Sequence, residues 1–380
     1  MRLITLSVAL LVLGNVLISC SRQNDGRYFP LPAQLQHVIH SESQSFMVDT
    51  LLTGLNRPWA MEFLPDNRVL ITEREGNILV IENGKLQESP LKGNIPVGLR
   101  DIQLHPQYDD NNWIYMSYYV EPTEQKGGYT EIMRGELIGD RLENEEIIYT
   151  TGPFELGGGA TGSRIVFDND GYLFFLVGIR GDRMRAQNMS HHSGKTMRIH
   201  DDGSIPSDNP FVGDQESLPE IYSYGHREHQ GFVLHPDTGE LWATEHGEKN
   251  GDELNLIQAG LNYGWPLASW STEYDGSVLS EDPLLEGTEP PVHYWTPSIN
   301  PSGLDFVTGE RYPGWDGNLF IGSLRPQMLN RSVMEDGKVI HDEKLIEGIG
   351  RVRSVRYAPD NFLYLLTEDT GLLVRLIPAE

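Results

Sequence analysis

Cysteine is nearly absent from this chain of 380 residues, whose single thiol is Cys20. One cysteine cannot form a disulfide within the chain, so no covalent cross-link supports the fold. Hydrophobic residues make up 38% of the composition, which is enough for a sizeable core. We therefore expect a folded body that depends on packing alone.

Positive charge is also scarce. The chain has 29 Lys and Arg against 55 Asp and Glu, a formal net charge of −26. A polyanion of this kind repels nucleic acid, which we exclude as a partner. Affinity for an anionic ligand would have to come from a local cluster of arginines.

Long apolar stretches are missing after the first twenty residues. Residues 3–18 follow the positive Arg2 and are apolar with few interruptions. This segment is too short to span a bilayer and is typical of a signal peptide. We therefore expect no membrane-spanning segment in the mature chain.

The signal peptide ends in the motif Leu17-Ile18-Ser19-Cys20, which resembles the bacterial lipobox. The resemblance implies that Cys20 is acylated and becomes the new N-terminus, so that the lipid alone attaches the protein to the membrane. We predict a signal peptide over 1–19 and a lipidated cysteine with a polar tether over 20–45. The expected location is the bacterial cell envelope, facing the periplasm or at the outer membrane. An ordinary secretory signal with a chance cysteine is the alternative.

A turn followed by a short apolar strand recurs along the rest of the chain. Forty glycines and 23 prolines suit many short strands joined by turns. The repeats cover 63–72, 104–115, 167–175, 234–244, 313–322 and 357–367. Six such units predict an all-β fold, a six-bladed β-propeller over 46–380, closed by pairing of 46–53 with 372–377. A β-sandwich or two all-β domains is the alternative, but no linker divides the repeats.

Four further segments carry most of the polar side chains that could form a site. They are 162–168 with 186–189, 223–231, 245–255 with 262–266, and 351–356. In this order they resemble the soluble pyrroloquinoline quinone (PQQ)-dependent aldose sugar dehydrogenases of the glucose/sorbosone dehydrogenase family, of which the chain looks like a divergent member. The resemblance covers about residues 50–377. It implies PQQ and Ca²⁺ as cofactors, an aldose sugar or related alcohol as substrate, and a separate electron acceptor.

The resemblance also assigns residues to PQQ. PQQ carries three carboxylates, which planar guanidinium groups bind well. Because residues two apart on a strand share a face, one site can receive both arginines of the Arg-x-Arg pair. The positions that match the family's cofactor ligands are Arg227, Gln230, Arg325 (where the family has a lysine), Arg351 and Arg353.

Calcium is the second cofactor that the resemblance implies, and it takes oxygen ligands. The family holds one ion with the carbonyls of a Gly-Pro pair, which here is Gly247-Glu248. A second, structural ion corresponds to Asp252, Glu253 and the carbonyl of Tyr263. A solvated acidic turn is the alternative for Asp252 and Glu253.

The family's catalytic base is missing from this sequence. The base is a histidine at the position of Ala160, and its acidic partner falls at Ile179. Alanine cannot accept a proton, so catalysis would need a replacement such as His246 or His229. We therefore expect a PQQ- and calcium-dependent oxidoreductase, or alternatively an envelope propeller that binds PQQ or a glycan without catalysis. A calcium-dependent lactonase-like hydrolase is a weaker alternative that depends on fold analogy.

Overall fold

The computed structural model describes residues 30–379 except 122–126, 153–154, 157–161 and 180. The expected signal peptide, Cys20 and Ala160 lie outside the described residues. Within them, no helix is long and apolar enough to cross a bilayer. The helical segments are η1 (Ala33–Leu35), α1 (Tyr108–Asn111) and η2 (Arg183–Gln187).

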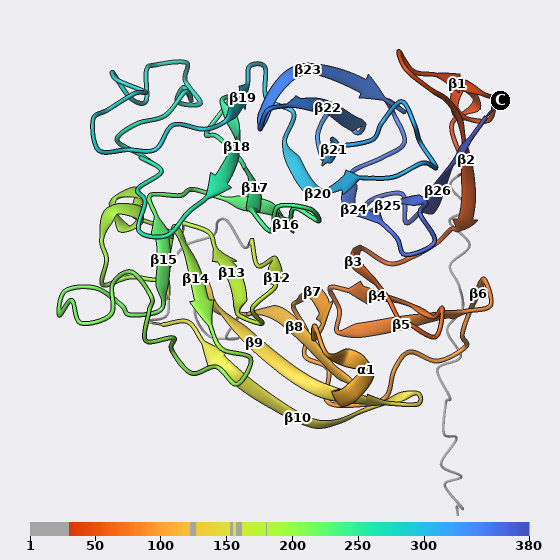
Figure 1. Cartoon of the computed structure of the whole chain (residues 1–380), viewed down its shortest axis with the longest axis horizontal. Helices are drawn as coiled ribbons and strands as arrows, with labels where there is room; N and C mark the ends of the chain where they lie inside the picture. Colours follow the sequence, from red (N-terminus) through yellow and green to blue (C-terminus); the bar gives the residue numbers. More distant parts are fainter. Residues whose placement is uncertain (1–29, 122–126, 153–154, 157–161, 180, 380) are drawn as a thin grey trace, which may run out of the picture.

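The described strands form six antiparallel sheets around a central axis, which confirms the predicted six-bladed β-propeller (Figure 1). From the axis outward, the first blade contains β3 (Pro58–Phe63), β4 (Val69–Glu73), β5 (Asn77–Glu82) and β6 (Lys85–Leu86). The second contains β7 (Leu99–Leu104), β8 (Trp113–Val120), β9 (Gly127–Ile138) and β10 (Arg141–Thr150), with β11 (Glu155–Leu156) paired to β9. The third contains β12 (Ile165–Phe167), β13 (Leu173–Val177), β14 (Lys195–Ile199) and β15 (Ile221–Tyr224).

The remaining three blades follow the same order. The fourth contains β16 (His229–Leu234), β17 (Leu241–Glu245), β18 (Asp252–Ile257) and β19 (His293–Trp295). The fifth contains β20 (Pro301–Val307), β21 (Asn318–Ser323), β22 (Leu329–Glu335) and β23 (Lys338–Leu345). The sixth contains β24 (Val352–Tyr357), β25 (Leu363–Thr367), β26 (Leu373–Pro378), β2 (Ser45–Leu52) and β1 (Ile39–His40).

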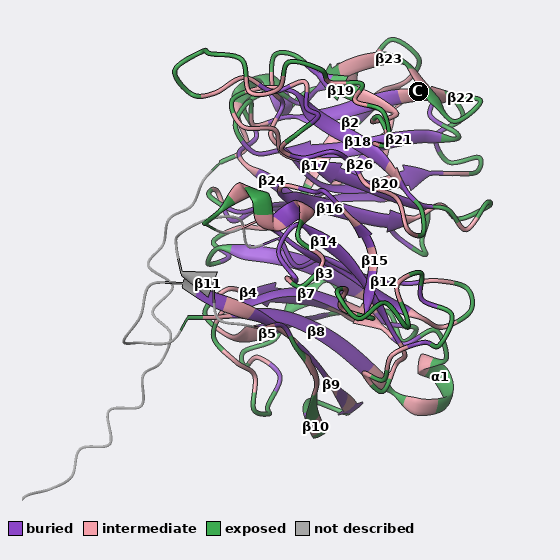
Figure 2. Ribbon diagram, turned by 90° about the vertical axis from the view of Figure 1, so that its left-hand side faces the viewer, coloured by how far each residue is buried: buried purple, intermediate pink, exposed green. Residues whose placement is uncertain are grey.

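Burial follows from the position of each strand in its blade. The innermost strands β3, β7, β12, β16, β20 and β24 contact one another in sequence around the axis and are mostly buried. The outer strands β10 and β23 are largely exposed and rich in charged residues. Figure 2 shows the buried strands through the middle of the molecule and exposed loops at its edges. Neighbouring blades therefore bury their apolar faces against each other.

The propeller closes through its two chain ends. Strand β2 pairs antiparallel with β26, and Val48 lies opposite Leu376. This confirms the predicted pairing of 46–53 with 372–377. The closure leaves no free edge between the first and last blades, because the N-terminal strand completes the sixth sheet.

The tether predicted over 20–45 is too long, because the chain packs against the propeller well before residue 46. Ile39 pairs with Phe46 across β1 and β2. Leu35 is 4% exposed and joins the same core cluster as Phe46 and Trp315. Leu35 and Ile39 are isolated apolar residues in a largely polar stretch, so the sequence does not show that they anchor the segment to the propeller.

The longest loops of the described region precede β15 and β19, as expected from the spacing of the repeats. The innermost strands all begin at one end of the axis. Residues at or just before these starts therefore come together from different blades, and this end of the propeller holds the candidate site.

Candidate functional site

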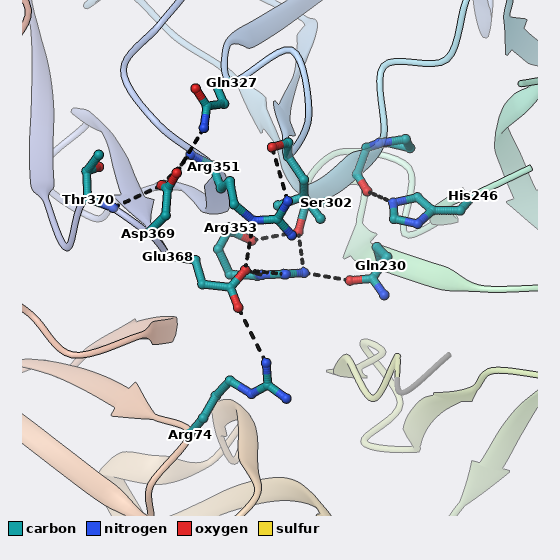
Figure 3. Close-up of polar contacts among 12 residues, drawn as sticks. Arg74, Gln230, His246, Ser302, Gln327, Arg351, Arg353, Glu368, Asp369 and Thr370 are labelled. Atoms are coloured by element: carbon teal, nitrogen blue, oxygen red, sulfur yellow. Dashed lines mark hydrogen bonds and ion pairs between the residues drawn. The ribbon is translucent and has the colours of Figure 1, made fainter. Parts of the chain in front are cut away.

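Three arginines surround one buried carboxylate at this end of the axis (Figure 3). Arg353 Nη2 lies 2.5 Å from Oε2 of Glu368, and Arg351 Nε lies 3.4 Å from the same oxygen. Arg74 Nη1 lies 3.5 Å from Oε1 of Glu368. Burial opposes ionisation of Glu368, but Arg353, then Arg351 and Arg74, outweigh it and lower its pKa to about 2. The carboxylate is therefore ionised and balances part of a strongly positive cluster.

Arg353 also reaches across the axis. Its Nη1 donates to Oε1 of Gln230 at 2.7 Å and to Oγ of Ser302 at 3.3 Å. These partners come from β16 and β20, the innermost strands of the fourth and fifth blades. Arg353 is thus fixed and buried, whereas the side chain of Arg351 keeps 39% exposure. Arg351 is the more available of the two to an incoming anion.

Arg227 lies on the other side of this region, just before β16. Its Nε donates to Oε2 of Glu248 at 3.0 Å, and its Nη1 donates to the His246 carbonyl at 3.2 Å. Its guanidinium lies 5.4 Å from the ring centroid of Trp265. Glu248 therefore serves as the ion-pair partner of Arg227.

His246 lies between the two arginine groups. Its Nε2 is 2.7 Å from the carbonyl of Pro301, the residue before Ser302, which binds Arg353. Since a carbonyl only accepts, Nε2 carries the proton in the neutral ring and Nδ1 is left as the basic nitrogen. The residue is half-buried, unlike the fully buried histidines nearby.

Arg325 differs from the other predicted cofactor ligands. It is exposed, and within the described region it has no hydrogen bond or ion pair. Its neighbour Leu324 accepts a bond from Arg351 Nη1 at 3.4 Å, so the main chain passes beside the arginine cluster. Arg325 belongs to the rim of the site in this conformation.

The predicted calcium residues divide into two groups. Asp252 is committed to holding the loop, because Oδ1 accepts from the Gly247 N–H at 3.0 Å and Oδ2 from the Asn300 N–H at 2.7 Å. Glu253 and Tyr263 instead line a small cavity of about 10 Å³, room for about one water molecule. This cavity is also lined by Glu245, Gly247, Gly251 and Ser269.

The donor chemistry of this cavity suits a hard cation. Burial raises the pKa of Glu253 well above its usual value, and the nearby carboxylate of Glu245 adds to the shift. Two buried carboxylates with backbone carbonyls around them match the oxygen ligands that calcium prefers. The residues present therefore fit the metal, although Asp252 supports the loop rather than facing the cavity.

His229 is wrong as a replacement base. It is completely buried between His226 and Glu245, and its Nε2 lies 3.4 Å from Oε2 of Glu245. A ring without any exposed surface cannot reach a substrate. His229 is the first residue of β16, and its ring packs 4.1 Å from that of His226 inside the protein, which the sequence alone does not show.

The segment around the missing base is only partly described. The N–H of Ile179 donates to the Arg227 carbonyl at 2.7 Å, so an aliphatic residue stands beside Arg227 where the family has the acidic partner of its base. Glu228 accepts from the Gly162 N–H at 3.1 Å and also from Gln230 Nε2. The carboxylate of Glu228 therefore lies beside Gly162, the first described residue after 157–161.

Sequence analysis missed Glu368 and Arg74, which no local motif marks. One signal was present: a Thr-Glu dipeptide lies at the end of the second strand in the first and fourth blades, and at the same place in the sixth blade, where Glu368 directly follows the last strand residue Thr367. The three glutamates, Glu73, Glu245 and Glu368, are 2%, 4% and 9% exposed. Because equivalent strand ends meet at one end of a propeller, the repeated dipeptide indicated buried carboxylates there.

Comparisons with known proteins agree with the propeller fold and place the chain beside known sugar dehydrogenases. The family described as Glucose / Sorbosone dehydrogenase matches residues 55–375. Aldose sugar dehydrogenase YliI of Escherichia coli is 38% identical over 344 residues, which cover 87% of this chain and 92% of that protein. The crystal structure of the soluble aldose sugar dehydrogenase from Escherichia coli in the apo-form has a TM-score of 0.84 and 36% identity, covering 88% of this chain and 100% of that one. The PQQ-bound form of an aldose sugar dehydrogenase from Streptomyces coelicolor has a TM-score of 0.70 and 27% identity, covering 88% and 98%.

Proposed function

We propose that this chain, which belongs to the glucose/sorbosone dehydrogenase family, oxidises an aldose sugar or a related alcohol with bound PQQ and passes the electrons to a separate acceptor. The observation that carries the proposal is the clustering of Arg351, Arg353 and Arg74 around Glu368, with Arg227 across the site. In a chain with a net charge of −26, such a cluster is a local site for a multiply charged anion.

The arginines divide the binding task. Arg353, buried and held by Gln230 and Ser302, gives the site a fixed positive point. Arg351 and Arg74 keep side-chain exposures of 39% and 31%, so they can turn toward a carboxylate of PQQ. Bound PQQ supplies an ortho-quinone that accepts a hydride from the substrate carbon.

Calcium is part of the proposal, because its cavity matches the metal's ligand preferences. Glu253 and the carbonyls of Gly247 and Tyr263 would hold the ion. We expect an ion there to fix the loop that carries Glu248 and His246. The loop in turn positions Arg227, which binds both residues.

His246 is the described residue best placed to take the proton of the substrate hydroxyl. Its Nε2 is anchored to the Pro301 carbonyl, which leaves Nδ1 as the accepting nitrogen. It stands in the loop between Arg227 and the arginine cluster. His246 would thus replace the base lost at Ala160.

A second candidate function is PQQ binding without catalysis. Ala160 and Ile179 favour it, because the family's base and its acidic partner are lost together. The binding groups are retained under either function. Turnover, rather than binding, therefore separates the two candidates.

The experiment reconstitutes the purified protein with PQQ and Ca²⁺ and measures dye reduction with a panel of aldoses and alcohols. PQQ binding is followed separately by absorbance. We expect Arg351→Gln to weaken PQQ binding at least tenfold, whereas Arg311→Gln, at the opposite end of the propeller, should leave it unchanged. Bound PQQ without turnover on any substrate would support the binding function, and absence of PQQ binding would overturn both.

The proposed location is the bacterial cell envelope, with Cys20 as the lipidated residue. It is supported by the motif at residues 17–20. Expression with labelled fatty acid should label the wild-type protein and leave Cys20→Ser unlabelled and released into the soluble fraction. A Cys20→Ser protein that keeps its label would contradict the assignment.

A further inference from the structure

A buried cluster of two histidines and a carboxylate lies beneath the loop that carries Arg227. His226 precedes β16, His229 is its first residue, and Glu245 is the last residue of β17. The three residues are 0%, 0% and 4% exposed. The two histidines belong neither to the arginine cluster nor to the groups assigned to calcium, whose cavity Glu245 also lines.

The donor atoms of this cluster are spaced as in a metal site. Nδ1 of His226 lies 3.1 Å from Oε2 of Glu245, and Nε2 of His229 lies 3.4 Å from the same oxygen. One donor atom from each residue lies within 4.8 Å of the others. Donors bound tetrahedrally at zinc-like distances of about 2.0–2.2 Å are separated by about 3.4 Å, so both contacts with Glu245 have the required spacing.

His229 has no other evident role. Neither of its ring nitrogens has a hydrogen-bond partner among the described residues, although both are completely buried. Burying a polar group without a partner is unfavourable, so native proteins rarely leave one in this state. Its Nε2 points close to the same carboxylate oxygen that His226 approaches. A bound cation between the three donors would satisfy Nε2.

The surrounding contacts orient the other two donors. Nε2 of His226 lies 2.9 Å from Oγ of Ser223, which leaves Nδ1 directed at Glu245. The remaining oxygen of Glu245, Oε1, accepts from the backbone N–H of Arg227. Outer contacts of this kind fix the ring orientation and the tautomer of metal-binding histidines.

We propose that His226, His229 and Glu245 form a buried structural site for a divalent transition metal of the zinc class. Two imidazole nitrogens and one carboxylate favour zinc, cobalt or nickel over calcium, which prefers oxygen. A water molecule fills the fourth position. Glu253 lies directly opposite Glu245 in the pairing of β17 with β18.

Such a metal would tie the start of β16 to the end of β17. Because Glu245 also holds the backbone of Arg227, the bound ion fixes the position from which that arginine enters the cofactor site. The expected effects are a higher melting temperature and a more rigid Arg227 loop. Neither depends on the redox activity proposed above.

The test uses the full chain, freed of metal by chelation and then saturated with Ca²⁺. Wild-type protein should bind one equivalent of Zn²⁺, which raises its melting temperature. Co²⁺ in its place should give the intense visible bands of a four-coordinate ion with nitrogen and oxygen ligands. His229→Phe, which keeps the ring volume, should lose both effects. The control is His200→Phe, which replaces a histidine at the opposite end of the third blade. This variant should keep both the Zn²⁺-dependent rise in melting temperature and the Co²⁺ bands.

The proposal is overturned if wild-type protein binds no Zn²⁺, if His229→Phe binds it equally well, or if excess Ca²⁺ displaces it. Should His229→Phe fail to fold, X-ray absorption of the wild-type Zn²⁺ complex decides. Two imidazole ligands support the site and an all-oxygen shell rejects it. PQQ binding is measured in parallel, so failure of the proposed function remains distinguishable.

Discussion

Arg227 is paired with Glu248, whose Oε2 lies 3.0 Å from the Arg227 Nε. The sequence suggested different partners, a PQQ carboxylate for Arg227 and calcium for the residue after Gly247. The side chains are 17% and 11% exposed, so the pair is only weakly screened by solvent. An incoming anion must therefore compete with Glu248 for this arginine.

The first prediction concerns that competition. Glu248→Gln removes the competing charge and keeps the backbone carbonyl available to calcium. We expect PQQ to bind about fivefold more tightly, corresponding to about 1 kcal/mol for a partly exposed ion pair. Titration followed by absorbance measures the change. Glu347→Gln, which replaces an exposed glutamate outside the site, serves as control. Unchanged affinity in Glu248→Gln would show that the Glu248 carboxylate does not compete with PQQ for Arg227.

The second prediction concerns acid stability. Glu368 has its pKa lowered from 4.5 to about 2, so its ionised form stabilises the fold above about pH 4.5. That contribution, of the order of 3 kcal/mol, is lost as the pH falls from about 4.5 to 2. Chemical unfolding should show a large loss of stability for Glu368→Gln at pH 7 and about half that loss or less at pH 3. An equal loss at both pH values would mean that charge is not the cause.

The third prediction concerns the proposed base. His246→Asn keeps a side chain that can donate to the Pro301 carbonyl but removes the basic nitrogen. We expect kcat to fall by about 10²–10⁴ with little change in PQQ binding. Steady-state kinetics with saturating PQQ and Ca²⁺ measures this. Retention of kcat would show that His246 is not the base, and Glu228 would then be the next residue to replace.

The fourth prediction concerns the N-terminal segment. Leu35→Ala removes a buried side chain from the core cluster with Phe46 and Trp315. We expect the free energy of unfolding to fall by about 2–3 kcal/mol. Val38→Ala, at a residue that is 42% exposed in the same segment, should change it by less than about 0.5 kcal/mol. Equal effects would mean that residues 30–44 are a detached tether.

The sequence predicted the architecture well because propeller repeats are local signals. Each turn-and-strand unit predicts one blade from a few consecutive residues. The apolar segments 46–53 and 372–377 predicted the closure, which β2 and β26 form by pairing. The site was harder to predict, because its partners come from different blades. Arg353 meets Gln230 from 123 positions away, and Arg74 meets Glu368 from 294 positions away.

The errors have physical causes of the same kind. His229 was considered as a base because a sequence does not show which way a strand-opening residue faces. Leu35 was placed in a tether because single apolar anchors in a polar stretch have no periodicity. Asp252 was assigned to calcium, yet two backbone N–H groups already occupy its oxygens.

The pairing of β2 with β26 also determines when the protein can finish folding. Arg375 binds Asp49 across 326 positions of the chain, so β2, which is synthesised early, must wait for β26. Contacts between such distant residues slow folding, and an unpaired β2 is exposed to other chains meanwhile. The propeller therefore cannot close before β26 has been synthesised, and a chain stalled before residue 373 should be a target for chaperones or proteases.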